Sequence, residues 1–131
     1  MSSFNDYTEN LVLTWLFTTS SATRPTAWYV GLFTSAPSDT GGGTEVSGSG
    51  YARVATGTIS GSGTATTFTN AAAIEFAAAS GGNWGTIGWA AVFDASTGGN
   101  MLCWAPLTTS RTINDGDVFR VPAGSLSITL T

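Results

Sequence analysis

The side chains best suited to acid–base chemistry are three aspartates, Asp94, Asp115 and Asp117, which lie in turn-forming stretches. Two carboxylates can hydrolyse a glycosidic bond only when they face each other across a cleft, and nothing in this pattern predicts a cleft. The sequence has no histidine and a single cysteine, Cys103, in an apolar stretch. Ser-His-Asp and Cys-His catalysis are therefore excluded. We expect no catalytic residue, and the protein is predicted not to be an enzyme.

The composition also limits metal and cofactor binding. Zinc sites built from thiolates and imidazoles are excluded by the same counts. The stretch 114–117, Asn-Asp-Gly-Asp, weakly resembles a calcium loop, but Arg120 and Val121 stand where further oxygen ligands would be needed. A turn is the favoured interpretation. Residues 48–50 and 61–63 are too short to cradle a phosphate. We expect no metal ion and no cofactor.

The five tryptophans could stack on sugar rings or bases. Four of them lie within apolar, periodic stretches, which favours core packing or contact with another subunit: Trp15, Trp28, Trp89 and Trp104. Trp84 is different because it stands between Gly-Gly-Asn and Gly85. It is the best candidate for an exposed aromatic side chain at a contact.

The charge content is low and acidic. Charged residues make up 9% of the 131 residues, with a formal net charge of −4 and no lysine, against about 25% in an average soluble domain. Such a chain is not expected to bind nucleic acid or an anionic membrane surface. The longest apolar run, 11–17, is shorter than the roughly 20 residues that span a bilayer. A surface with so few charges has little protection against association, so we expect neighbouring subunits to cover much of it. The alternative is a free monomer that stays soluble through its hydroxyl groups and its net charge of −4.

Residues 3–17 are predicted to form a helix. Ser3 is a suitable N-cap, and acidic side chains follow in the first turns. Phe4, Tyr7, Leu11 and Trp15 recur at helical spacing and are our candidate interface residues, together with Trp84. The second half of this helix is apolar on most sides, more than one sheet can cover. We therefore expect a second protomer or a larger assembly on the other side.

The rest of the chain is predicted to form short strands. Period-two alternation and turn signals indicate about eight of them, as in an antiparallel β-sandwich of the jelly-roll type. Residues 35–50 are rich in glycine and are interpreted as a long loop without intrinsic order, an adaptable arm. The whole chain, 1–131, is expected to be one β-sandwich domain preceded by the helix.

The ordered series of motifs resembles a family of small structural proteins from the virions of tailed bacteriophages. The motifs are Val30-Gly-Leu-Phe-Thr-Ser-Ala-Pro37, Gly41-Gly-Gly-Thr-Glu-Val-Ser47, Gly50-Tyr-Ala-Arg53, Ala91-Val-Phe-Asp-Ala-Ser-Thr-Gly-Gly-Asn-Met-Leu102 and Asp115-Gly-Asp-Val-Phe119. The resemblance covers nearly the whole chain. Its members carry no catalytic motif, and some are labelled as tail-fibre proteins.

The resemblance implies a virion protein that is made in the host cytoplasm. Because fibres usually contain repeats or heptads and this chain has neither, we favour a capsid cement or decoration subunit on the capsid surface. It would bridge major capsid proteins and associate with copies of itself as a trimer or dimer. The alternative is a tail or tail-fibre component, whose glycan-binding version would use an exposed Trp84 and the loop carboxylates.

Overall fold

Short strands and glycine-rich turns make up most of the computed structural model, which describes residues 3–130. A single helix, α1 (Asp6–Phe17), follows the first strand. The strands are β1 (Ser3–Phe4), β2 (Tyr29–Ser35), β3 (Thr44–Glu45), β4 (Val54–Ala55), β5 (Ile59–Ser60), β6 (Thr67–Asn70), β7 (Ile74–Glu75), β8 (Gly85–Phe93), β9 (Met101–Ile113), β10 (Arg120–Val121) and β11 (Ser127–Thr129). They are more numerous than the eight or so strands that the sequence predicts, and several of them are only two residues long.

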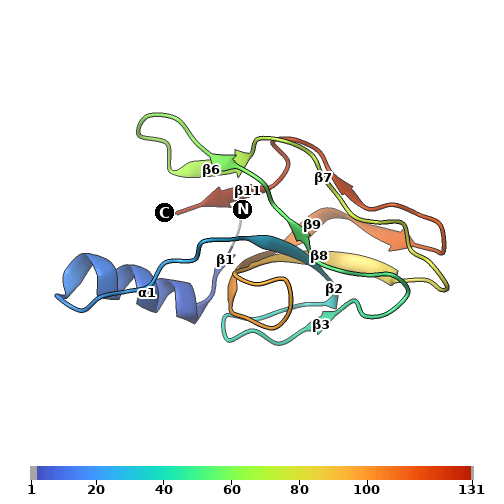
Figure 1. Cartoon of the computed structure of the whole chain (residues 1–131), viewed down its shortest axis with the longest axis horizontal. Helices are drawn as coiled ribbons and strands as arrows, with labels where there is room; N and C mark the ends of the chain where they lie inside the picture. Colours follow the sequence, from blue (N-terminus) through green and yellow to red (C-terminus); the bar gives the residue numbers. More distant parts are fainter. Residues whose placement is uncertain (1–2, 131) are drawn as a thin grey trace.

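The strands form an antiparallel sandwich. The large sheet has the order β1-β9-β8-β2-β3, with β4 also paired to β2, and the small sheets are β10-β7 and β11-β6-β5. In Figure 1 the small sheets lie above the large one, with α1 projecting beyond both. The predicted fold, a mainly β sandwich with one N-terminal helix, is confirmed.

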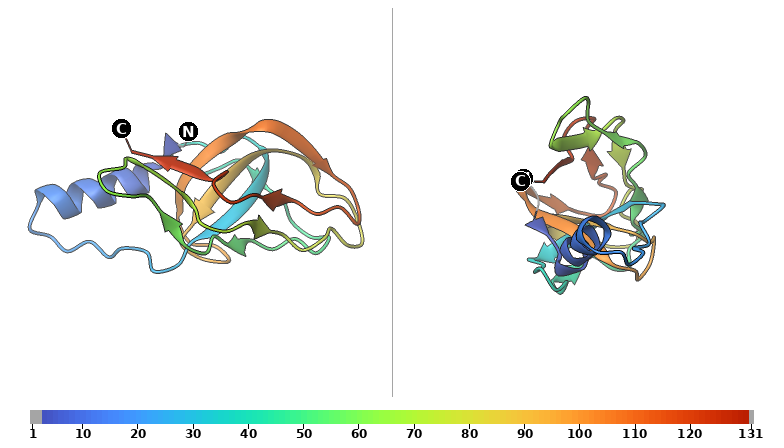
Figure 2. Two further views of the ribbon diagram at one scale, coloured as in Figure 1. Left: turned by 90° about the horizontal axis from the view of Figure 1, so that it is seen from above. Right: turned by 90° about the vertical axis from the view of Figure 1, so that its left-hand side faces the viewer.

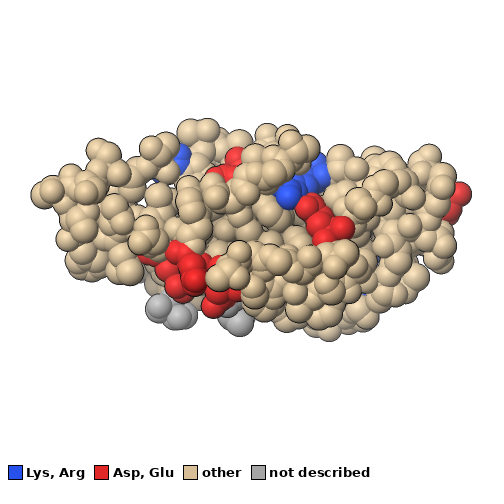
Figure 3. Space-filling view, turned by 90° about the horizontal axis from the view of Figure 1, so that it is seen from below, with Lys and Arg blue, Asp and Glu red and all other residues tan. Residues whose placement is uncertain are grey.

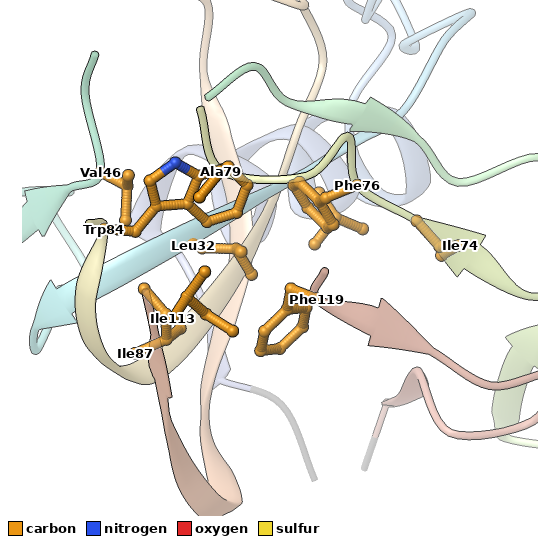
Figure 4. Close-up of a cluster of buried hydrophobic side chains, with 10 residues drawn as sticks. Leu32, Val46, Ile74, Phe76, Ala79, Trp84, Ile87, Ile113 and Phe119 are labelled. Atoms are coloured by element: carbon orange, nitrogen blue, oxygen red, sulfur yellow. The ribbon is translucent and has the colours of Figure 1, made fainter. Parts of the chain in front are cut away.

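The main core lies between these layers. Leu32 on β2 and Ile87 on β8 are fully buried from the large sheet, and Phe76 beside β7 is 2% exposed on the opposite side. Figure 4 shows how the side chains of both layers meet. The ring of Phe119 stands edge-on to that of Phe76, with 5.8 Å between their centroids. Each large apolar side chain buried in this way contributes about 1.5–3 kcal/mol.

The helix begins three residues later than predicted, because Ser3 and Phe4 form a strand. They pair with Trp104 and Cys103 of β9, and Phe4 packs against the cluster that contains Cys103. Asn5 is the N-cap residue, in an extended conformation with φ −76° and ψ 155°. Asn5 and Ser3 are both good N-cap types, so the strand pairing decides where the helix starts.

The glycine-rich segment 35–50 is held against the body, and the prediction of an arm without order is wrong. It contains β3, which pairs with β2, and Val46, which is 7% exposed and donates its backbone N–H to Leu32 O at 2.9 Å. Gly43 has a φ of +73°, and a Cβ there would lie 2.9 Å from Ser35 O. Only glycine allows this close approach.

Among the described residues, no helix is long and apolar enough to cross a membrane.

Candidate assembly surface

The helix α1 is anchored at its first turn. The backbone N–H of Asn5 donates to Leu102 O at 3.1 Å, and its side-chain amide donates to Ser38 O and Asp39 O at 2.9 and 3.1 Å. Thr8 Oγ1 donates to Leu102 O at 2.7 Å. The α1 helix contacts only β1 and β9 among the described elements, and none of its residues is buried. Figures 1 and 2 show it extending away from the sheets, with the chain 18–28 returning beside it.

The far end of α1 exposes large apolar side chains that the body does not cover. Leu13, Trp15, Leu16 and Phe17 are 56%, 69%, 55% and 77% exposed, and we call these four residues the α1 tip. The sequence prediction that one chain cannot cover this helix is confirmed for the described residues. Trp15 was among the predicted interface residues. Leu13, Leu16 and Phe17 were not, although their apolar character is visible in the sequence.

A large apolar groove lies beside α1. Its volume is about 840 Å³. It is lined by Phe4, Thr8, Leu11, Pro25, Trp28, Gly57, Thr58, Ile59, Ala65, Thr66, Phe68, Val92, Leu102, Cys103, Ile128 and Leu130. The predicted interface residues Phe4 and Leu11 are half-buried in its wall. Trp15 lies one turn beyond Leu11 on the same helix face, so the apolar wall continues outward past the groove.

Tyr7 lies at a different place from these residues. It is 39% exposed and lines a polar recess of about 570 Å³ together with Asp39, Arg53 and Asn100. The five predicted interface residues therefore do not form one surface.

Trp84 belongs to the core, and the prediction that it is an exposed contact residue is wrong. It is 6% exposed, and Figure 4 shows its indole among the buried side chains. Its Nε1 donates to Ser49 O at 2.9 Å, and its ring stands at 90° to that of Tyr51, with centroids 5.3 Å apart. A buried indole needs such an acceptor, and Ser49 lies 35 residues away in the sequence. The glycines next to Trp84 in the sequence do not indicate that its side chain is buried.

The three candidate carboxylates hold turns. Asp94 accepts hydrogen bonds from the backbone N–H and the side-chain amide of Asn100, Asp115 accepts one from Gly81 N, and Asp117 accepts one from Asn114 N. The pairing of β8 with β9 places Asp94 at one end of this hairpin and the other two at the opposite end. Within residues 3–130, no group of three or more His, Cys, Asp or Glu side chains is placed to hold a metal ion.

A partly buried ion pair organises several motif residues on the outer face of the large sheet. Arg53 Nε lies 2.8 Å from Glu45 Oε2, and Arg53 Nη2 donates to Glu45 Oε1 at 2.8 Å. The guanidinium lies 3.4 Å above the Phe93 ring centre, which is a cation–π contact. Tyr51 donates its hydroxyl to Glu45 Oε2 at 2.7 Å. Burial, reinforced by this bond to Glu45, raises the pKa of the Tyr51 hydroxyl.

The Cys103 thiol on the floor of the apolar groove is not a reactive group at neutral pH. It is 4% exposed, and its burial raises the pKa to about 11. A protonated thiol is a poor nucleophile, so Cys103 acts as a small apolar side chain.

No charged residue lines the apolar groove, whereas Asp6, Asp39, Glu45 and Arg53 line the polar recess. On the face shown in Figure 3, acidic and basic side chains occupy a few small patches, and the rest is uncharged. The arrangement offers apolar contact area rather than a set of reacting groups.

A family model described as podophage GP4 fiber I protein gp80 matches residues 3–129. A comparison with curated proteins found no significant match.

Proposed function

The chain belongs to the podophage GP4 fiber I protein family, and on this premise we propose that it is a structural subunit of a virion fibre. Membership makes it a phage virion structural protein. The finer role, a fibre subunit held to its neighbours through the α1 tip, is supported by the family description and by the exposed apolar surface of α1.

The exposure of the α1 tip is the observation that carries this proposal. Its four side chains leave more than half of their surface uncovered. Covering them would contribute roughly 4–8 kcal/mol, from about 1.5–3 kcal/mol for each fully buried side chain. A gain of this size is comparable to the lower estimates of the free-energy cost of association, about 4–15 kcal/mol. A subunit in a repeating structure uses such a surface, whereas a free monomer leaves it in water.

We do not propose an enzymatic activity for this chain. Asp94, Asp115 and Asp117 each accept a hydrogen bond from a backbone N–H group, which is a structural role. The glycan-binding version of the fibre role loses its main residue, because Trp84 is buried.

The capsid cement role remains the second candidate. It is favoured by the lack of internal repeats and of heptads that would drive a long coiled coil, and α1 has only 12 residues. A cement subunit would use the same α1 tip against the major capsid protein.

Location on the particle separates the two roles. Purified virions are disrupted mildly, heads and fibres are separated by density, and this chain is quantified in each fraction by mass spectrometry. The fibre proposal predicts that the chain follows the fibres. Recovery with the head shells would support the cement role instead, and absence from both fractions would contradict a structural role in the virion.

A further inference from the structure

We propose that the apolar groove of one copy of this chain binds the α1 tip of a second copy. The contact is made by the outer face of the tip, which consists of Leu13, Leu16 and Phe17. This inference rests on the proposed structural role and deepens it by naming the partner.

The groove selects an apolar and uncharged occupant. None of the residues that line it carries a charge at neutral pH. Its floor, Val92, Leu102 and Cys103, is buried, while Phe68 and Leu130 at its rim are 43% and 54% exposed. A charged segment entering this space would lose its hydration without gaining a partner.

The α1 tip has the matching chemistry. Residues 10–17 contain no charged side chain. Leu13 and Leu16 are three residues apart, and Leu13 and Phe17 are four apart, so the three lie on one face of the helix. Leu11, which lines the groove of its own chain, is two residues from Leu13 and points to the other side. One helix thus forms a wall of its own groove and presents a second apolar face outward.

The outer face cannot enter the groove of its own chain. The hydrogen bonds of Asn5 to Ser38 O and Asp39 O and of Thr8 to Leu102 O fix the first turn of α1. A regular helix transmits this orientation to its last turn, since each residue is set by the hydrogen bonds of the turn before it. The outer face of Leu13 and Phe17 therefore meets a groove only when that groove belongs to another copy.

The contact area fits a self-association surface. Leu13, Leu16 and Phe17 of the outer face are 56%, 55% and 77% exposed, and an aromatic side chain such as Phe17 buries about 150–250 Å². Phe17 alone offers roughly 115–190 Å², and the two leucines add to it. Each copy contributes both a tip and a groove, so in a closed assembly every copy makes this contact twice, once with each surface.

Sedimentation of the purified full chain gives the first test. The wild-type chain is expected to form a dimer or trimer at tens of micromolar, and Leu13→Gln/Phe17→Ser is expected to raise the dissociation constant at least about tenfold. Val118→Gln is the matched control, because Val118 is 45% exposed and does not line the groove. Since the replaced side chains are exposed, circular dichroism should show unchanged folding in all three proteins. A monomeric wild type, or an oligomer that the double variant leaves intact, would overturn the inference.

Cross-linking between copies gives the second test, and it identifies the groove. In a Cys103→Ala background, a chain with Asn10→Cys, an exposed position on the same helix face as Leu13 and Phe17, is mixed with a chain of different mass that carries Thr58→Cys, a groove position. A short bis-maleimide is expected to join the two chains, whereas Asn10→Cys mixed with Val118→Cys should give no product. Equal products from both mixtures, or none with Thr58→Cys, would refute the groove as the binding site. Neither refutation changes where the chain is found on the virion, so the proposed function is tested separately.

Discussion

Replacing Arg53 with methionine should destabilise the sandwich strongly. The Arg53 side chain is 9% exposed and makes two bonds of 2.8 Å to the Glu45 carboxylate. Its Nη1 also donates to Ala95 O and Gly98 O at 3.0 and 2.8 Å, so one side chain fastens the β8–β9 loop to β3. Methionine keeps most of the apolar contact with Phe93 but provides none of these donors.

The size of the effect follows from the partner that is left behind. Removing one member of a buried ion pair typically costs about 3–5 kcal/mol. Glu45 is 25% exposed, which lets water hydrate part of the unpaired carboxylate. We therefore expect a loss near the lower limit, about 3 kcal/mol. With about 1–3 kcal/mol per molar urea for a domain of this size, the urea midpoint should fall by about 1–3 M.

Equilibrium urea unfolding followed by tryptophan fluorescence measures this shift. Arg120→Met is the matched control, because Arg120 is exposed on β10, and it should move the midpoint little. Glu45→Gln/Arg53→Met should be more stable than the sum of the single changes predicts, since no unpaired carboxylate remains. A loss below about 1 kcal/mol for Arg53→Met, or strict additivity in the double variant, would show that the ion pair does not hold these loops together.

Three further outcomes can be measured in the same way. Gly31→Ala should cost about 1–3 kcal/mol by overpacking, because its Cβ would lie 2.8 Å from Glu45 Oε2, whereas Gly88→Ala, with nothing within 4 Å, should be tolerated. Asn70→Ala should cost about 2–4 kcal/mol, because this buried amide bonds Ala72 O, Pro122 O and Leu126 N. The pKa of the Cys103 thiol rises from 9.0 to about 11 on folding. The stability that comes from burying the neutral thiol is therefore complete below pH 9 and is lost between pH 9 and 11. Stability should fall by up to about 3 kcal/mol over that interval, and less steeply in Cys103→Ala; an equal slope in both proteins would contradict the assignment.

The sequence predicted the features that depend on local periodicity. Short strands separated by turns were predicted for most of the chain, and the structure has them, with β2 and β11 as examples. The helix was found because Leu11 and Trp15 repeat at helical spacing without an interrupting glycine or proline. The second half of the helix is apolar on most sides, and this is why an exposed apolar tip could be predicted.

The errors arose where partners distant in the sequence decide the outcome. Phe4 fits the helical period, but its pairing with Cys103 draws it into a strand. Trp84 stands among glycines, yet Ser49 O supplies the acceptor that lets the indole be buried. Glu45 and Arg53 were noted only as motif residues, because their contact depends on how β3 packs against β2. The groove beside α1 was missed for the same reason, since its walls come from segments throughout the chain.

Imaging the assembled virion fibre by cryo-electron microscopy tests the central claim most directly. Density for this chain is expected in the fibre, with Trp15 and Phe17, which are exposed in the single chain, covered there by a neighbouring subunit. A fibre in which the α1 tip of every copy faces solvent would contradict it.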